Sequence, residues 1–483
     1  MEPILLIHGY STEGKDNTVE RIYGTLPAEL RKLFGRSQVK ELNLSRWISL
    51  NDGIMLDDVS FAMDRALKQE HPHLLESGFH IIIHSTGALV ARNWIKKFSP
   101  KPSPIINFIH LAGANFGSGL AHVGQGQLSR WKNTITQGTG VGIRVLHELE
   151  FGSWKTLDLH SHFLQAGNDI YHDYQVQEFC IIGSQTLSAL RLVPIRYVKE
   201  DSSDNTVRTS ACNLNFNYIP VKPKAKTYKL GVRGVNALTR KRLENKAVSD
   251  LYYEHDLSYL HNTREAIPFA IAYETAHFGD EIGIVSGKKN RNVVMPLIKS
   301  ALTTPYQITA YRKTVERFDT ATKRSLDRAG KLKNNLREWN KQSQYEGHAQ
   351  LIFRIRDQFG NGVENYDVTF QSDKSDKELP RLEKMIEDRH SNTQDEGTIT
   401  FYLRTMEFNK RSRTWIDRLA RISPVDIEIS GTELQSADIA YVPLTIRLGN
   451  AEVKSIIESF KTTIIDITLV RLPSHDVFEI KKS

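Results

Sequence analysis

The sequence predicts an α/β domain in residues 1–305 and a β-sandwich domain in residues 347–483, joined by a helical connector. Three observations lead to this prediction. Short apolar strands alternate with amphipathic stretches up to about residue 305, which is typical of a mostly parallel sheet with helices on both faces. A basic helical pattern follows. After Gly347 the chain consists of short alternating strands separated by turns, which is typical of an antiparallel sandwich.

The expected elements of the first domain follow from hydrophobic periodicity. Strands are expected at 3–7, 38–42, 79–84, 105–111, 178–183 and 267–273, and helices at 17–34, 54–69, 87–98 and 291–302. Two long segments, at about 117–175 and 213–265, contain Gly, Asn, His and aromatic residues without a clear strand period. Insertions of this length usually lie above the strand ends, so we expect them to be lids or substrate-binding loops.

Residues 306–346 are expected to form a basic amphipathic connector. Apolar residues recur at three- and four-residue steps from Tyr311 to Trp339, and the stretch 311–341 holds ten Lys/Arg and four Asp/Glu. Two interpretations are open: the helix packs its apolar stripe on both domains, or it lies against anionic lipid head groups. A nucleic-acid partner is not expected, because aromatic interleaving and a binding motif are both missing from the sequence.

The last domain contains alternating strands such as LIFRIRD, TITFYLRT and IIDITLVRL, with the turn Phe359–Gly362 after the first of them. One or two short helices are expected near 377–388 and 411–420. We expect this domain to dock to a membrane or to a protein partner, and the sequence does not identify such a partner.

The composition is that of a globular protein: 483 residues, 40% hydrophobic and 25% charged, with a formal net charge of +8. Two cysteines, Cys180 and Cys212, are too few for a disulfide framework, and nothing near them suggests a metal site. The first strand begins almost at Met1, and neither a signal-peptide pattern nor a membrane-spanning apolar run is present. We therefore expect a cytoplasmic protein in the producing cell, or one exported by a route that reads no N-terminal signal.

The stretch FHIIIHSTGALVAR, residues 79–92, is the strongest sign of chemistry. A buried strand breaks at Ser85 into a helix through the pattern x-Ser-x-Gly, which is the context of a nucleophile elbow. The usual motif has a glycine two residues before the serine, and Ile83 stands there. An ordinary strand-to-helix turn is the alternative interpretation.

An oxyanion hole needs two N–H groups that point into the same cleft. The strand ILLIHGY, residues 4–10, ends in His-Gly, after which the backbone can turn. The N–H groups of Tyr10 and of Thr86, the residue after the nucleophile, are therefore the predicted donors. A simple β-turn at Gly9 is the alternative.

A serine nucleophile also needs a base and an acid that orients the base. Asp204 lies in a polar loop beyond the strand at 178–183, and His277 follows the apolar run at 267–271. The chain order Ser85, Asp204, His277 is that of α/β-hydrolases. The alternative for Asp204 is a solvated loop carboxylate, as Asp201 in the same loop is expected to be. The alternative for His277 is a structural histidine. Two further histidines, His255 and His261, are rival candidates for the base.

On these residues the sequence resembles the α/β-hydrolase lipases, in particular bacterial lipase-like and phospholipase-like members. The matching stretches are ILLIHGY, IIIHSTGALVAR, LAGANFGSGLAHVGQG and DNTVRTSACNLN, and the resemblance covers roughly residues 1–305. Two departures are Ile83 at the first elbow glycine and Asn205 at the glycine after the acid.

The resemblance implies a serine hydrolase without cofactor or metal that cleaves carboxylic esters of lipids through an acyl-enzyme. Ser85, His277 and Asp204 would be the triad, and His84 and Phe116 would contact the substrate, with core packing as the alternative for Phe116. A catalytically silent scaffold for protein or membrane binding and a serine amidase or peptidase stay open as alternatives. An effector delivered to a target cell and a cytoplasmic esterase are equally compatible with these features.

Overall fold

The computed structural model describes residues 2–8, 19–49, 51–119, 142–186, 200–244, 251–255, 264–333 and 341–473. The chain divides into two compact units. Unit 1 contains Met1–Asn215, Thr263–Gly347 and Phe408–Trp415, and unit 2 contains Phe216–Asn262, His348–Glu407 and Ile416–Ser483. No helix among the described residues is long and apolar enough to cross a lipid bilayer.

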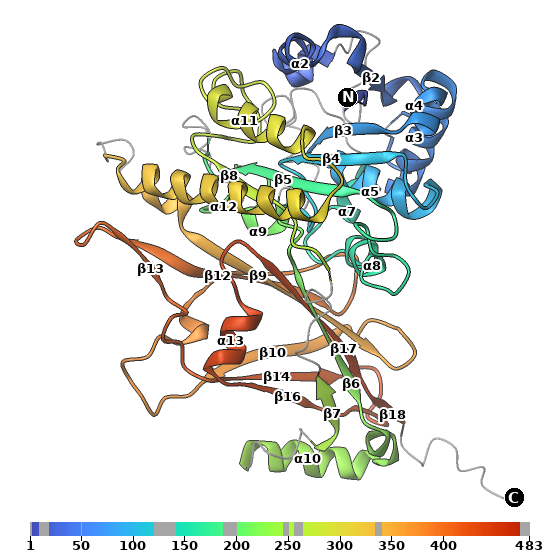
Figure 1. Ribbon diagram of the computed structural model, residues 1–483. Coiled ribbons are helices and arrows are strands. Elements are labelled where there is room, and N and C mark those ends of the chain that lie inside the picture. The colour runs from blue at the N-terminus through green and yellow to red at the C-terminus, as the bar shows by residue number, and fades with distance from the viewer. Residues whose placement is uncertain are drawn as a thin grey trace, which may run out of the picture. The chain divides into compact units, whose positions relative to one another are not determined.

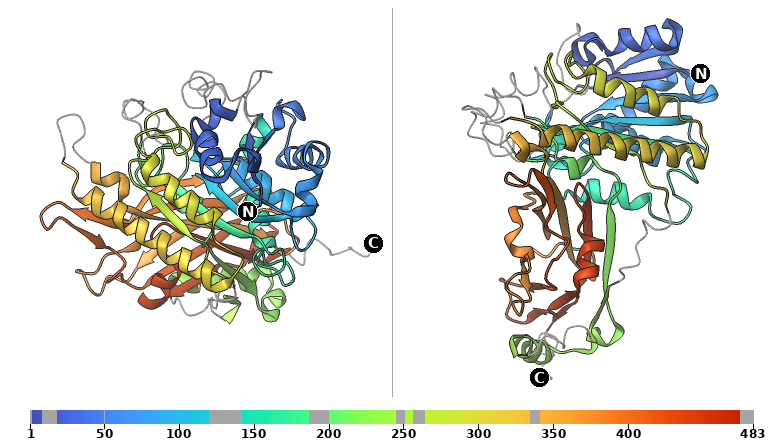
Figure 2. Two further views of the ribbon diagram at one scale, coloured as in Figure 1. Left: turned by 45° about the horizontal axis from the view of Figure 1, so that its top comes forward. Right: turned by 60° about the vertical axis from the view of Figure 1, so that its left-hand side comes forward.

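A parallel sheet forms the centre of unit 1 (Figure 1). Six strands of the described residues follow the order β2-β1-β3-β4-β5-β8, and every adjacent pair runs parallel. Their bounds are β1 Ile4–His8, β2 Val39–Asn43, β3 Phe79–His84, β4 Ile105–Leu111, β5 Gln177–Gly183 and β8 Phe269–Ala272. Strands β1, β3, β4 and β8 are nearly continuous apolar runs, as expected for a sheet with helices on both faces (Figure 2).

The helices of unit 1 connect these strands. They are α1 Val19–Tyr23, α2 Leu26–Phe34, α3 Leu56–Glu70, α4 Pro72–Ser77, α5 Gly87–Phe98, α7 Ile143–Glu148, α8 Trp154–His162, α9 Thr209–Cys212, α11 Arg291–Leu302 and α12 Ile308–Gly330. Helix α5 packs on β3 and α3, and α8 packs on α5. The part of the expected insertion 117–175 that contains α8 is therefore packed against the core, while residues 120–141 lie outside the described residues.

Residues 306–346, which the sequence predicts to be a connector, are grouped with unit 1 as part of Thr263–Gly347. Helix α12 buries Tyr311, Phe318 and Ala329 and packs along β8 (Figure 1). The Tyr311 hydroxyl donates to the Glu178 carbonyl at 2.8 Å. The helix ends at Gly330 rather than at residue 339, and residues 334–340 lie outside the described residues. Its apolar stripe is thus used for packing within unit 1.

Unit 2 is a β-sandwich. One sheet has the order β10-β14-β16, and the other has the order β11-β12-β9-β17-β6-β7 with β13 beside β12. Phe370 of β10 lies 4.9 Å from Phe401 of β12 and 6.0 Å from Phe353 of β9, measured between ring centroids, so aromatic rings fill the space between the sheets. The strands of both sheets are β6 Asn217–Pro223, β7 Tyr253–His255, β9 Gly347–Asp357, β10 Asn365–Ser372, β11 Ile386–Ser391, β12 Thr398–Asn409, β13 Thr414–Asp417, β14 Val425–Thr432, β16 Leu444–Leu448 and β17 Thr462–Leu469.

The described part of unit 2 also contains a two-stranded sheet and two α-helices. The small sheet pairs β15 Ile439–Tyr441 with β18 Arg471–Pro473, and the helices are α10 Val232–Glu244 and α13 Asn450–Ile456. Of the one or two short helices expected near 377–388 and 411–420, a three-residue 3₁₀ helix lies in the first range and none lies in the second. The first range contains the 3₁₀ turn Leu382–Lys384 and the start of β11, and the second contains β13.

Residues 216–262 belong to unit 2, although the sequence analysis expected 213–265 to be an insertion of the α/β domain. Strand β6 pairs in parallel with β17, from Asn217↔Thr463 to Val221↔Ile467, and these backbone hydrogen bonds assign the segment to the sandwich. The antiparallel prediction is confirmed for β10–β14, β14–β16 and β11–β12. Strand β17 departs from this prediction, because it runs parallel to both of its neighbours, β9 and β6.

A buried ion pair ties α5 to β5 in unit 1. Arg92 of α5 donates to the carboxylate of Glu178, and His110 Nε2 of β4 lies 3.2 Å from Glu178 Oε1. Burial raises the pKa of Glu178, but Arg92 and His110 outweigh burial and lower it to about 2. The carboxylate is therefore charged at neutral pH, and the ion pair holds the helix that follows Ser85 against the sheet.

We expect Glu178→Gln to destabilise the protein by about 3–5 kcal/mol, because Arg92 would keep a buried charge without its partner. The pair stabilises the fold above the unfolded-state pKa of Glu178, and this stabilisation is lost as the pH falls toward about 2. Denaturant unfolding at neutral and acidic pH measures both effects. The matched control is Glu281→Gln, whose ion pair with Lys289 is exposed and should contribute less than about 1 kcal/mol.

Candidate active site

The candidate site begins at the turn between β3 and α5. Ser85 follows the last residue of β3 and has a φ of 55°, in the left-handed region that non-glycine residues rarely adopt. Such a conformation costs of order 1–3 kcal/mol and persists only where its surroundings hold it. Here the Ser85 N–H donates to the Leu111 carbonyl at 3.1 Å, and the Ser85 carbonyl accepts from Ala88 N at 3.1 Å and from Ala114 N at 3.3 Å. The turn has the geometry of a nucleophile elbow.

Small residues make room behind this turn. A Cβ added to Gly113 would lie 2.9 Å from Ala88 Cβ, so α5 approaches the loop after β4 closely. Ile83, which stands at the usual elbow glycine, is fully buried within β3 and pairs with His110 in the sheet register. The branched side chain is therefore part of the core, and the turn starts after it.

Two hydrogen bonds join Ser85, His277 and Asp204. Ser85 Oγ lies 3.0 Å from His277 Nε2, and His277 Nδ1 lies 2.8 Å from Asp204 Oδ2. The backbone reinforces the second contact, because the His277 N–H donates to the Asp204 carbonyl at 2.9 Å. With the carboxylate as acceptor, Nδ1 carries the proton and Nε2 can accept the proton of the serine hydroxyl.

The loop around Asp204 is built to hold a carboxylate in place. Asp204 is fully buried, and its Oδ1 accepts from the N–H groups of Thr206 at 3.1 Å and Val207 at 2.8 Å. The next residue, Asn205, is buried with a φ of 77°, a left-handed conformation that Asn tolerates better than most non-glycine residues. The backbone at this position therefore has the conformation that glycine, the residue expected here from the sequence resemblance, adopts most easily.

Arg208 is a supporting residue that the sequence analysis did not single out. Its guanidinium donates to both carboxylate oxygens of Glu200, at 2.8 and 2.7 Å, and stacks over Phe151 at 4.1 Å. A β-bridge joins Ser203 to Arg208 across the acid loop. A sequence signal for Arg208 lies in the stretch DNTVR, residues 204–208, where a single arginine follows the candidate acid Asp204.

His84 contacts the backbone of His277. Its Nε2 lies 3.1 Å from the His277 carbonyl oxygen, and the two ring centroids are 4.5 Å apart. Burial, and secondarily the nearby His277, hold the pKa of His84 well below its usual value, so the ring is neutral and can donate to the carbonyl. The predicted contact of His84 with substrate stays a prediction.

Of the two predicted oxyanion donors, Thr86 is among the described residues and Tyr10 is not. Thr86 is the N-terminal cap of α5, and its N–H donates to none of the residues that the structure describes. Tyr10 and Gly9 lie outside the described residues. Phe116 is buried, with its ring centroid 4.5 Å from that of His160, a position that also fits the alternative of core packing. Its role as a wall of the acyl pocket stays a prediction.

The competing residues lie elsewhere. The Asp201 carboxylate accepts from Ser343 Oγ at 2.9 Å. His255 is part of β7 in unit 2, and His261 lies outside the described residues. Among the described residues, no group of three or more His, Cys, Asp or Glu side chains is arranged to hold a metal ion.

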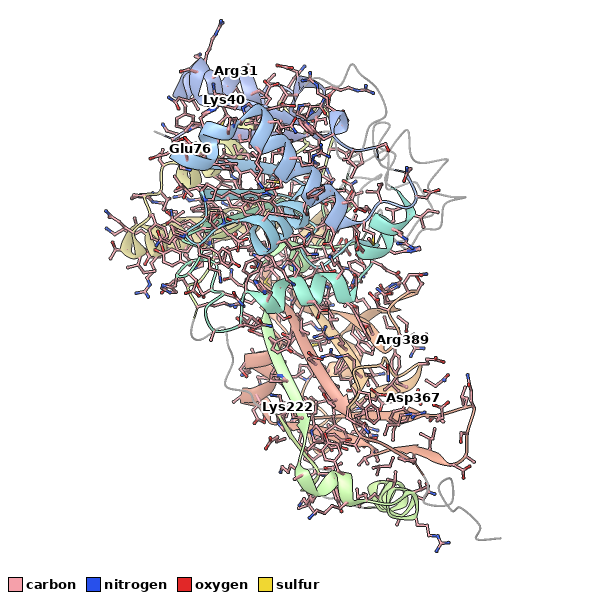
Figure 3. All side chains as sticks on the ribbon, turned by 90° about the vertical axis from the view of Figure 1, so that its right-hand side faces the viewer. Arg31, Lys40, Glu76, Lys222, Asp367 and Arg389 are labelled. Atoms are coloured by element: carbon pink, nitrogen blue, oxygen red, sulfur yellow. The ribbon has the colours of Figure 1, made fainter. Side chains whose placement is uncertain are left out.

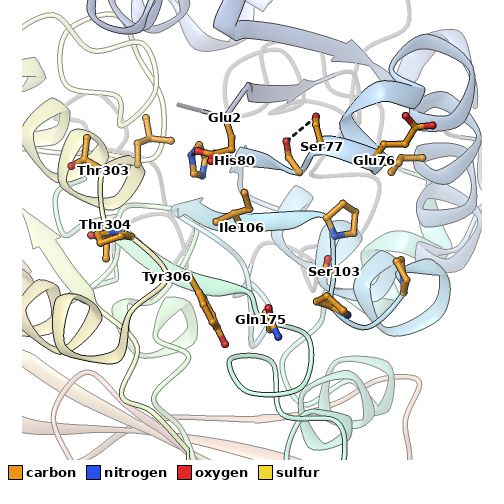
Figure 4. Close-up of a pocket in the computed structure, with 17 residues that line it drawn as sticks. Glu2, Glu76, Ser77, His80, Ser103, Ile106, Gln175, Thr303, Thr304 and Tyr306 are labelled. Atoms are coloured by element: carbon orange, nitrogen blue, oxygen red, sulfur yellow. Dashed lines mark hydrogen bonds and ion pairs between the residues drawn. The ribbon is translucent and has the colours of Figure 1, made fainter.

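A separate cavity lies at the opposite edge of the sheet. It has a volume of about 810 Å³ and is lined by residues at the amino ends of β3 and β4, among them His80 and Ile106 (Figure 4). His80 Nε2 lies 3.5 Å from a carboxylate oxygen of Glu2, and burial lowers the pKa of His80 to about 4. Because Ser85 follows the carboxyl end of β3, this cavity is not part of the candidate site.

The parallel sheet, the elbow after β3 and the order serine, aspartate, histidine define the α/β-hydrolase fold for unit 1. Two solved structures of phospholipase PlaB from Legionella pneumophila are similar to the chain over its whole length. One, in complex with thio-NAD, has a TM-score of 0.76 at 21% identity and covers 100% of this chain and 97% of that chain. The other has a TM-score of 0.78 at 22% identity and covers 100% and 96%. No protein-family model and no curated protein sequence matches this sequence.

This likeness establishes the fold. It extends through both units, so the chain has an α/β-hydrolase fold followed by a β-sandwich, as the sequence predicted. At 21–22% identity the likeness shows the fold and does not by itself show the function.

We expect Asn205→Gly to keep stability within about 0.5 kcal/mol, since glycine adopts the same left-handed backbone freely. Asn205→Val should cost about 1–3 kcal/mol, because a β-branched residue is strained at positive φ next to Asp204. Thermal unfolding of the two variants measures the difference. Equal behaviour of both variants would contradict the role given to the loop conformation.

Proposed function

We propose that this chain is a serine hydrolase that cleaves carboxylic esters of lipids through an acyl-enzyme intermediate. The observation that carries the proposal is the hydrogen-bonded chain from Ser85 through His277 to Asp204, at 3.0 and 2.8 Å. The strained Ser85 backbone supports it, since strain of this kind is concentrated at functional sites. The full-length likeness to a phospholipase supports the lipid substrate.

In the first step the Ser85 oxygen attacks the ester carbonyl carbon while His277 Nε2 takes the hydroxyl proton. Asp204 accepts from His277 Nδ1 and stabilises the imidazolium that forms. The burial of Asp204 keeps this contact in a low dielectric, where it is stronger than in water. The carbonyl oxygen becomes an oxyanion, and the Thr86 N–H at the start of α5 is a donor to it. The Tyr10 N–H, which the sequence predicts as the second donor, belongs to a residue outside the described ranges.

The tetrahedral intermediate then collapses. His277 gives its proton to the leaving alcohol oxygen, and the acyl group stays bound to Ser85 Oγ as an ester. A water molecule, deprotonated by His277, attacks this ester, releases the fatty acid and restores the serine. His84, which contacts the His277 carbonyl, keeps the base in position through both steps.

We expect Ser85→Ala to abolish labelling by a fluorophosphonate probe and to lower ester hydrolysis by about 10⁶-fold, because the nucleophile is removed. The matched control is Ser77→Ala, an exposed serine that should leave both readouts unchanged. Activity on phospholipid vesicles that survives in the Ser85 variant would favour the silent-scaffold alternative. Turnover of amides without turnover of esters would instead favour an amidase or peptidase.

We expect Asp204→Asn to lower kcat by about 10⁴-fold, because an amide in this position favours the wrong imidazole tautomer. Steady-state kinetics on a soluble ester measure the effect, and circular dichroism checks the fold. Asp201→Asn is the matched control, since this carboxylate lies in the same loop but contacts Ser343. A comparable loss of kcat in both variants would mean that the substitutions disturb the loop, and it would contradict the specific role of Asp204 as the acid.

A further inference from the structure

The most exposed large apolar side chains of the described residues lie in unit 2. Phe359 is 73% exposed, Leu434 is 71% exposed and Leu251 is 52% exposed, and Tyr228 is also 48% exposed. Each lies in a turn or connection and not in a strand of the sandwich. Exposed apolar side chains that gather in one place are a sign of an interaction site.

Strand direction brings Phe359 and Tyr228 to the same end of unit 2. Strands β9, β17 and β6 run parallel, with Asp357 opposite Leu469 and Ile467 opposite Val221. The turn after β9 carries Phe359, and the segment after β6 carries Tyr228. Because both follow the carboxyl ends of adjoining parallel strands, they emerge from one edge of the sheet.

Leu434 and Leu251 lie at this end as well. Strand β14 ends at Thr432, opposite Asn365 at the start of β10, so the loop with Leu434 lies beside the turn with Phe359. Arg471 joins the two, because its backbone exchanges hydrogen bonds with the Gln358 amide, both at 2.8 Å, and its guanidinium lies 3.3 Å from Glu433. Leu251 precedes β7, whose residue Tyr253 pairs with Pro223 at the end of β6.

Positive charge surrounds these side chains. Residues 221–243 contain eight Lys/Arg and no Asp/Glu. They form the end of β6, the 3₁₀ helix Ala225–Lys229 and α10, and Lys222 on β6 is labelled in Figure 3. Lys226, Lys229 and Arg233 are exposed, and Lys226 Nζ lies 5.5 Å from the Tyr252 ring. Nearby acidic residues include Glu254, Glu364, Glu396 and Asp438, which are exposed. Two others have partners: the buried Asp357 accepts from the Phe359 N–H, and Glu433 is paired with Arg471.

We propose that this end of unit 2 docks on an anionic phospholipid bilayer. The docking surface consists of the apolar residues Tyr228, Leu251, Phe359 and Leu434 and the cations Lys226, Lys229 and Arg233. Apolar and aromatic side chains on separate turns can insert among acyl chains, while lysine and arginine stay at the level of the head groups. Such a surface fits a fluid interface better than a folded partner, which would need one continuous patch. The inference rests on the proposed function, since a lipid ester hydrolase must reach substrate at an interface.

The test measures binding separately from catalysis. The full-length Ser85→Ala protein is sedimented with vesicles of phosphatidylcholine alone or mixed with phosphatidylglycerol, at low and high salt. We expect binding to the mixed vesicles that weakens at high salt. We expect a loss of at least about tenfold with Lys226→Glu, Lys229→Glu and Arg233→Glu combined, and a similar loss with Phe359→Ser and Leu434→Ser combined.

Two control variants give the test its specificity. Phe61→Ser removes a side chain that is 50% exposed in unit 1, and Lys323→Glu with Arg324→Glu reverses two exposed charges of α12. Both should bind vesicles as the parent does. The proposal is overturned if the α12 variant loses binding while the docking-surface variants keep it. It also fails if the docking-surface variants change the oligomeric state instead of vesicle binding, or if the surface binds RNA as tightly as anionic vesicles.

The outcome for docking is distinguishable from the outcome for catalysis. In the protein with Ser85 intact, the docking-surface variants should hydrolyse a soluble p-nitrophenyl ester at the parent rate. They should act more slowly on anionic vesicles. If the parent hydrolyses no ester at all, the proposed function fails while vesicle binding still reports on the docking surface.

Discussion

The parallel register of the unit 1 sheet is the constraint on which the candidate site depends. Parallel strands end at one edge, so residues that follow different strands meet there although they are far apart in the chain. Ser85 comes directly after β3, and His277 comes five residues after Ala272, the end of β8. The path to His277 passes tightly over β5, because a Cβ added to Gly183 would lie 1.9 Å from the Thr275 carbonyl oxygen. This backbone approach brings the imidazole back toward the strand that carries the serine.

The loop that carries Asp204 further restricts the orientation of His277. Asp204 binds His277 through its carboxylate and through its carbonyl, so the two loops are joined at two points. The Thr206 and Val207 N–H groups occupy the other carboxylate oxygen, and Arg208 is held by Glu200. Hydrogen bonds to a charged group contribute about 1.5–3 kcal/mol each, more than neutral ones. The His277 ring therefore has few alternative orientations, which is the condition for the proposed proton transfer to and from Ser85 Oγ.

Unit 2 shows where local sequence patterns stop being informative. The alternation in 217–223 identifies a strand only weakly, and its partner, β17, lies more than 240 residues later in the chain. The alternation of each segment predicts a strand, but backbone hydrogen bonds between distant segments leave no signal in either sequence that tells which strands pair. The same pairing aligns the ends of β6, β9 and β17, and thereby gathers exposed apolar residues and lysines from separate loops.

The sequence by itself determined the elements whose signal is local. Strands 79–84 and 105–111 and helices 87–98 and 291–302 agree with β3, β4, α5 and α11 residue for residue, because burial on a sheet or helix imposes a period on neighbouring residues. The serine, the aspartate and the histidine were also chosen by their place after such elements. Only the tertiary structure decided which polar groups meet, that α12 packs in unit 1, and that 216–262 joins the sandwich. It also decided the positive φ angle of Ser85, since hydrogen bonds with Leu111 and Ala114, from β4 and the loop after it, hold this strained backbone.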